Sequence, residues 1–154
     1  RLGYVVAPEA VFPKLLQAKQ AADLHTPGFN QRMVAEVLKG GFLERHVPTI
    51  RSLYKQQRDA MLAALEREMA GLGVHWNSPQ GGMFLWLRLP EGLDATALLP
   101  QAVERNVAFV PGAAFYADQA DPRTLRLSFV TASAAQIDTG IAALAATIRA
   151  AQLA

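Results

Sequence analysis

The sequence predicts an α/β fold in which helices cover one face of a small, mostly antiparallel sheet. Two patterns carry this prediction. Residues 83–89 and 124–130 alternate between apolar and other side chains, which is the period of a strand with one buried face. Residues 50–69 and 137–148 repeat apolar side chains every three or four positions, which is the period of a helix with one buried stripe. We therefore expect a long helix before the sheet and a last helix packed against it.

The first part of the chain combines one expected strand with two helices. Leu2–Val6 is a short run rich in β-forming residues, and Pro8 ends it, so a strand is predicted there. Pro13 suits a first helical turn and predicts a helix, which the segment His25–Gly28 interrupts. The next helix is expected over residues 29–39.

Breaking and capping residues set the bounds of the other elements. The long helix is expected to begin after Pro48, because proline disrupts the interior of a helix, and to end before Gly71. Asp94 can cap a further helix, and a short strand is expected over residues 106–110. Ser133 begins a capping box at the start of the last helix.

Composition argues against several classes of protein. The 154 residues include 15 Lys+Arg and 13 Asp+Glu, a net charge of +2, and the basic residues are scattered, which disfavours a nucleic-acid or membrane surface. The absence of cysteine excludes disulfides and is compatible with a reducing compartment. No apolar run approaches the roughly 18 residues of a membrane span. No metal site is predicted, because the three histidines have no partner at metal-ligand spacing: His25, His46 and His75.

The sequence begins directly at an expected strand. The sequence begins at Arg1 rather than at methionine, and the expected strand follows at once. The first residues lack the charged, apolar and small-residue layout of a signal peptide. We therefore expect a piece of a larger protein, and the alternative is a shortened expression product.

Arg126 is the residue that chemistry singles out. It lies in mid-strand between Leu125 and Leu127, where an unpaired guanidinium would be costly to bury. An arginine fixed on a sheet offers a planar fork of donors to a carboxylate. That carboxylate belongs either to an Asp or Glu of the protein, which the residues alone favour, or to a ligand.

Four short motifs follow one another along the chain and together carry a family resemblance. They are Arg1–Tyr4, Pro79–Trp86, Val107–Phe115 and Leu125–Phe129. In this order they resemble four parts of the fold-type I aminotransferases that use pyridoxal 5'-phosphate. These parts are the end of the segment that begins with the Schiff-base lysine, the first small-domain strand, the Val-x-Pro-Gly-x-x-Phe segment and the carboxylate-binding strand. The Gly-Gly-Met-Phe-x-Trp motif at residues 81–86 is most similar to that of the 2-aminoadipate and kynurenine transaminases.

The resemblance implies roles for individual residues. Arg126 would bind the α-carboxylate of the substrate, and Arg1 would help to bind the cofactor phosphate. The loop at His25-Thr26 falls where such enzymes reach toward the active site of the neighbouring subunit. Two further pairs would shape the rim of the pocket: Gly81 with Gly82, and Pro111 with Gly112.

The resemblance also implies that catalysis needs residues outside this chain. The lysine that forms the Schiff base falls before Arg1, and the aspartate that pairs with the pyridine nitrogen is missing as well. The chain's own lysines lie on expected helices in other sequence settings: Lys14, Lys19, Lys39 and Lys55. We therefore expect no catalytic residue in this chain and no pyridoxal 5'-phosphate bound to it alone.

The parent protein that the resemblance implies is a cytoplasmic, homodimeric aminotransferase. It would move an amino group from an amino acid to a 2-oxo acid in two half-reactions, with no nucleic-acid or membrane partner. Residues 1–27 would be the remnant of its large cofactor-binding domain. Residues 28–154 would be its small C-terminal domain, including the long connecting helix.

Three alternatives stay open at this point. The first is the sensor domain of a winged-helix transcription regulator that carries an aminotransferase-like domain, which a basic helix-turn-helix in the N-terminal sequence would identify. The second is a lyase or decarboxylase on the same scaffold. The third is a free-standing ligand-binding or interaction module.

Overall fold

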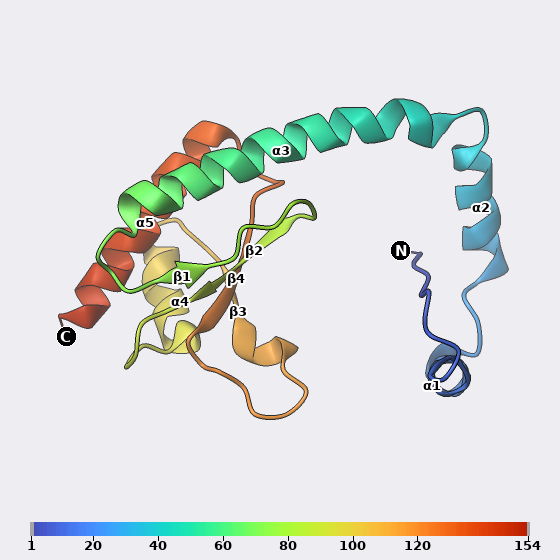
Figure 1. The fold of residues 1–154 in the computed structure, drawn as a ribbon, viewed down its shortest axis with the longest axis horizontal. Helices are drawn as coiled ribbons and strands as arrows, with labels where there is room; N and C mark the ends of the chain where they lie inside the picture. The colour runs from blue at the N-terminus through green and yellow to red at the C-terminus, as the bar shows by residue number, and fades with distance from the viewer. Residues whose placement is uncertain (1, 154) are drawn as a thin grey trace. The chain divides into compact units, whose positions relative to one another are not determined.

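The computed structural model describes residues 2–153. The chain forms two compact units, with the division between Pro48 and Thr49. We call Arg1–Pro48 the N-terminal unit and Thr49–Ala154 the C-terminal unit, and we describe each by itself. Figure 1 shows their helices and strands.

The N-terminal unit contains α1 (Phe12–Asp23), α2 (Gly28–Leu38) and the first turns of α3 (Phe42–Glu68). The two predicted helices are confirmed, with Pro13 in the first turn of α1. The strand predicted over Leu2–Val6 is wrong, because residues 2–7 have no regular structure and the side chain of Val6 is 88% exposed. A strand requires a hydrogen-bonded neighbour, and no strand among the described residues pairs with this segment.

The long helix begins earlier than its sequence predicts. α3 starts at Phe42, so Pro48 lies inside it rather than before it. The proline removes one backbone donor, but the other contacts of the first turns hold the helix together. The backbone N–H of Arg45 donates to the carbonyl of Gly41 at 3.4 Å, and the rings of Phe42 and His46 stack with centroids 5.1 Å apart.

The C-terminal unit is built on one antiparallel sheet of four strands in the order β1-β2-β4-β3 (Figure 1). β2 (Phe84–Arg88) and β4 (Thr124–Ser128) confirm the two alternating patterns and pair along their full length. β1 (His75–Trp76) is too short to show an alternating pattern in the sequence, so it was not predicted. β3 (Val110–Pro111) is shorter than predicted, because the N–H groups of Asn106 and Val107 donate back to carbonyls of the preceding helix.

Helices cover one face of this sheet, as the alternating patterns predict. α4 (Ala95–Glu104), α5 (Ala134–Gln152) and the second half of α3 contribute buried residues to the same core as the sheet leucines. Both predicted caps are present: the Asp94 carboxylate accepts from the N–H of Thr96 at 2.6 Å, and Ser133 forms its capping box with Gln136. The fold class is therefore confirmed.

The two faces of the sheet differ in chemistry. Leu85, Leu87 and Leu125 point into the core and are fully buried. The intervening residues of the two central strands point the other way, and they include aromatic rings, a hydroxyl and two guanidinium groups: Phe84, Trp86, Arg88, Arg126 and Ser128. The candidate site lies on this second face.

Candidate functional site

Arg126 occupies the centre of the face that the helices leave open. It lies opposite Trp86 of β2 on one side and opposite Val110 of β3 on the other. Its side chain is half-buried, and the two residues next to it in the chain, Leu125 and Leu127, are buried on the core face. Both neighbouring strands therefore restrict where its guanidinium can point.

Two aromatic rings contact the guanidinium of Arg126. Its Cζ lies 4.0 Å from the centroid of the Phe84 ring and 4.7 Å from that of the Phe115 ring. Phe115 ends η1 (Gly112–Phe115), the short 3-10 helix after β3. Cations within about 6 Å of a ring centroid are attracted to the negative face of the ring. Both contacts therefore stabilise the guanidinium at this position.

No carboxylate of residues 2–153 occupies the donor edge of Arg126. Among residues 2–153, no Asp or Glu lies within ion-pair distance of it, and its N–H groups form no hydrogen bond with these residues. The protein-internal pair, which the residues alone favour, is thus not formed within the described part of the chain. A planar fork without a partner can bind a carboxylate through two parallel hydrogen bonds.

The turn that carries Phe115 is packed tightly against β4. A Cβ on Gly112 would lie 2.1 Å from the Oγ1 of Thr124, so η1 and β4 approach to a distance that only glycine allows. The Thr124 hydroxyl is itself fixed, because it donates to the carbonyl of Asp121 at 2.8 Å. Gly112, predicted at the pocket rim, therefore sets the start of this turn.

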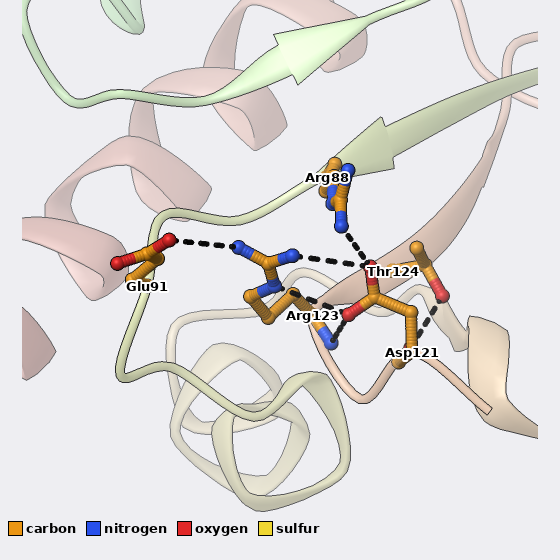
Figure 2. Close-up of polar contacts among 5 residues, drawn as sticks. All are labelled: Arg88, Glu91, Asp121, Arg123 and Thr124. Carbon is orange, nitrogen blue, oxygen red and sulfur yellow. Dashed lines mark hydrogen bonds and ion pairs between the residues drawn. The ribbon is translucent and has the colours of Figure 1, made fainter. Parts of the chain in front are cut away.

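A small ionic network holds the loop before β4 (Figure 2). The Asp121 carboxylate accepts from Arg123 Nε at 3.1 Å and pairs with Arg88 of β2 at 2.7 Å. A second contact of Arg123, to Glu91, is longer at 4.0 Å. Hydrogen bonds from the Arg123 side chain and backbone lower the pKa of Asp121 below its ordinary value, with smaller contributions from the charges of Arg123 and Arg88. Asp121 thus links β2 to the segment that leads into Arg126.

A cavity of about 640 Å³ lies near the start of α5, between this helix, the segment that follows α4 and the end of β4. Its polar lining includes Arg105, Asn106, Ser128, Gln136 and Thr139. Arg126 is not one of the described residues that line it. The guanidinium therefore stands on the open face of the sheet rather than inside this cavity.

The other predicted site residues belong to other segments of the chain. Arg1 lies outside the described residues. His25 and Thr26 belong to the N-terminal unit, where the carbonyl of Thr26 accepts from Gln31 Nε2 at 2.9 Å. Gly82, with φ of 82°, forms the turn just before Phe84.

The described residues do not form a complete site for pyridoxal 5'-phosphate. Each lysine of the chain is exposed, on a helix or at its C-cap, and bonds to a side chain three or four residues away: Lys14 to Gln17, Lys19 to Asp23, Lys39 to Glu36 and Lys55 to Asp59. Residues 2–153 thus offer no unengaged lysine amine for a Schiff base. They also contain no group of three metal-ligating side chains, and none of their helices is long and apolar enough to cross a membrane.

Comparison with known proteins identifies the family. The model of the aminotransferases of class I and II matches residues 1–144. The chain belongs to this family. It is 47% identical to a 2-aminoadipate transaminase from Thermus thermophilus over 141 residues, which are 92% of this chain and 35% of that protein. The predicted family and subgroup are thereby confirmed.

The fold of this aminotransferase chain is shared as well. The crystal structure of LysN, an alpha-aminoadipate aminotransferase from Thermus thermophilus, is 44% identical and superposes with a TM-score of 0.78, over 96% of this chain and 38% of LysN. LysN was crystallised with N-(5'-phosphopyridoxyl)-L-leucine. YisV, an uncharacterized HTH-type transcriptional regulator of Bacillus subtilis, is 34% identical over 97% of this chain and 30% of its own length. The chain spans about a third of the length of the relatives that it matches.

Proposed function

We propose that the full-length protein transfers an amino group between an amino acid and a 2-oxo acid, and that this chain supplies the substrate-carboxylate site through Arg126. One observation carries the proposal: a half-buried guanidinium stands on an open sheet face, held by two rings, with no carboxylate partner among residues 2–153. The membership of the chain in the aminotransferase family supports it.

In the proposed reaction, Arg126 binds and orients both substrates. Amino acids and 2-oxo acids share an α-carboxylate, so one planar fork can hold the donor and the acceptor in the same position. Two parallel hydrogen bonds also fix the rotation of the substrate, which places its reacting carbon reproducibly. The surrounding rings exclude water from one side of the ion pair and thereby strengthen it.

We propose that pyridoxal 5'-phosphate is the cofactor of the full-length protein and that Arg1 helps to bind its phosphate. This cofactor supplies the site that accepts and returns the amino group. The phosphopyridoxyl ligand of LysN supports the proposal. The catalytic lysine would belong to residues outside this chain, because all four lysines present are exposed and engaged with nearby side chains.

We further propose a cytoplasmic homodimer that binds neither nucleic acid nor membranes. Residues 1–27 would belong to its large domain and residues 28–154 to its small domain. The exposed apolar side chains of α1 and α2 support further packing of the N-terminal unit, against the rest of the protein or against a second subunit.

The proposed carboxylate site is tested by Arg126→Ala in the full-length gene product. With L-2-aminoadipate as amino donor and 2-oxoglutarate as acceptor, kcat/KM is expected to fall by the equivalent of about 2–5 kcal/mol, as when one partner of a buried charge pair is truncated. Arg126→Lys is expected to recover little of this loss, because a point charge does not reproduce the planar fork. Near-normal kinetics in either variant would contradict the role of Arg126 in binding the substrate carboxylate.

The sensor domain of a transcription regulator is the second candidate, and the identity with YisV favours it. In that case Arg126 would bind the carboxylate of an effector without amino transfer. The full-length gene product would then bind DNA and show no transaminase activity. A measured turnover with L-2-aminoadipate, without DNA binding, would exclude this candidate.

A further inference from the structure

The contacts of Arg126 with Phe84 and Phe115 come from two different parts of the chain. Phe84 lies on β2, where it pairs with Ser128, so it is the diagonal neighbour of Arg126 on the same face of the sheet. Phe115 arrives on η1, beyond the opposite edge of β4. The sheet register and the η1 turn therefore bring one ring each to the same guanidinium.

Further contacts keep the second ring in place. Trp86 packs edge-on against Phe115, with ring centroids 5.8 Å apart. The start of η1 is fixed by the close approach of Gly112 to Thr124, and the loop that follows η1 ends in the Asp121 network (Figure 2). Phe115 thus sits on a turn that is anchored at its start and after its end.

The rings restrict a side chain that is otherwise flexible. A free arginine loses about 2 kcal/mol of rotamer entropy when it is fixed, and this loss weakens any complex that has to fix it. Rings that already contact the guanidinium remove part of that cost. The N–H groups of Arg126 form no hydrogen bond with residues 2–153, and these are the groups that a carboxylate requires.

We infer that Phe84 and Phe115 are positioning residues, which hold the Arg126 guanidinium edge-on to an incoming carboxylate. This inference rests on the proposed function of Arg126 and adds to it the means by which the fork is preorganised. The two rings act through the guanidinium and need no contact with the substrate.

The test replaces each ring by an aliphatic side chain in the full-length gene product. Phe84 is 37% and Phe115 is 50% exposed, so Phe84→Leu and Phe115→Leu leave the core intact. Each variant is expected to raise KM for L-2-aminoadipate about threefold to tenfold with kcat little changed, which is the range of a partly exposed cation–π contact. Inhibition by propionate, a carboxylate with a minimal side chain, is expected to weaken by the same factor.

Two controls separate positioning from other roles. Phe84→Tyr and Phe115→Tyr keep the ring and are expected to keep KM within about twofold of the wild type, because the cation–π contact survives. In the Arg126→Ala background, neither Leu substitution is expected to change KM further, because the group through which the rings act is gone.

The outcomes distinguish this inference from the proposed function. If Arg126→Ala itself leaves KM unchanged, the proposed carboxylate site fails, and this inference fails with it. If Arg126→Ala raises KM but the Leu variants do not, only the positioning role is overturned. An effect of the Leu variants that is equally large with and without Arg126 also overturns it, since the rings would then contact the substrate directly.

Discussion

The two units of this chain differ in what their apolar side chains contact. In the C-terminal unit, leucines of β2 and β4 meet buried residues of α3, α4 and α5 in one core. In the N-terminal unit, α1 and α2 are equally regular helices, yet none of the described residues 2–48 is buried. Large side chains such as Phe29 (73% exposed) and Val37 (60% exposed) remain open to solvent.

The difference shows that regular helices and independent stability are separate properties. Helical periodicity and a proline in the first turn suffice to predict α1 correctly. Most of the stability of a helix in a protein nevertheless comes from burying its apolar stripe. The C-terminal unit meets this condition within the chain, and the N-terminal unit does not. Four substitutions test this contrast, in descending order of expected effect.

The largest effect is expected for Leu144→Ala. Leu144 is fully buried on α5, so the substitution leaves a cavity and is expected to cost about 2–5 kcal/mol of unfolding free energy. Urea unfolding of the 154-residue chain, followed by circular dichroism, measures the loss. Leu153→Ala is the matched control, because Leu153 is 89% exposed. Equal effects of the two substitutions would show that burial of Leu144 does not stabilise the C-terminal unit.

Gly112→Ala is expected to come second. The added Cβ would overlap with Thr124 Oγ1, and overpacking of this kind typically costs about 1–3 kcal/mol. Gly140→Ala is the control: Gly140 lies in α5 with only an ordinary 3.8 Å contact at its Cβ position, so alanine there is expected to stabilise by about 0.5–1 kcal/mol. Thermal melts of both variants should therefore shift in opposite directions. A shift of both in the same direction would show that the η1–β4 contact is looser than described.

Much of the fold could be predicted from the sequence because local patterns determine it. The alternation over residues 83–89 and 124–130, and the caps at Asp94 and Ser133, depend on neighbours within a few positions. The strand over Leu2–Val6 could not be judged in this way, since a strand depends on a partner that its own residues do not specify. The start of α3 was misplaced for a related reason: contacts of Phe42 and Gly41 hold the turn that Pro48 was expected to exclude.

The candidate site was predictable only in part. The sequence places Arg126 mid-strand among leucines, which is enough to single it out. It does not reveal that Phe84 and Phe115 contact its guanidinium, because these contacts depend on the register between β2 and β4 and on the path of η1. The ion pair between Asp121 and Arg88 was missed for the same reason, because it joins β4's leading loop to β2. The contact between Asp121 and Arg123 joins residues only two positions apart. One signal in the sequence pointed to these contacts: the alternation of residues 83–89 places Phe84 and Trp86 on the face of the sheet opposite the core.

Asp94→Ala is expected to have a smaller effect, because it removes one cap and no core contact. The Asp94 carboxylate accepts from the N–H groups of Thr96 at 2.6 Å and Ala97 at 3.3 Å. Loss of such a cap typically costs about 1 kcal/mol. Asp94→Asn keeps an acceptor in the same place and is expected to restore most of the loss in the same urea titration. If Asn proves as costly as Ala, the cap does not account for the stability of α4.

The smallest effect is expected for Leu16→Ala in the N-terminal unit. Leu16 is 46% exposed on α1, and alanine favours a helix at least as strongly as leucine, so the change is expected to stay within about 0.5 kcal/mol in the 154-residue chain. This is the same chemical change as Leu144→Ala, so the ratio of the two losses measures how far the units differ. In the full-length gene product, the proposed packing of α1 would bury Leu16, and the cost there is expected to rise to about 2 kcal/mol or more. A loss that is equally small in both proteins would leave α1 solvent-exposed in the full-length protein too, whereas a large loss in the 154-residue chain alone would mean that the N-terminal unit already buries its helices.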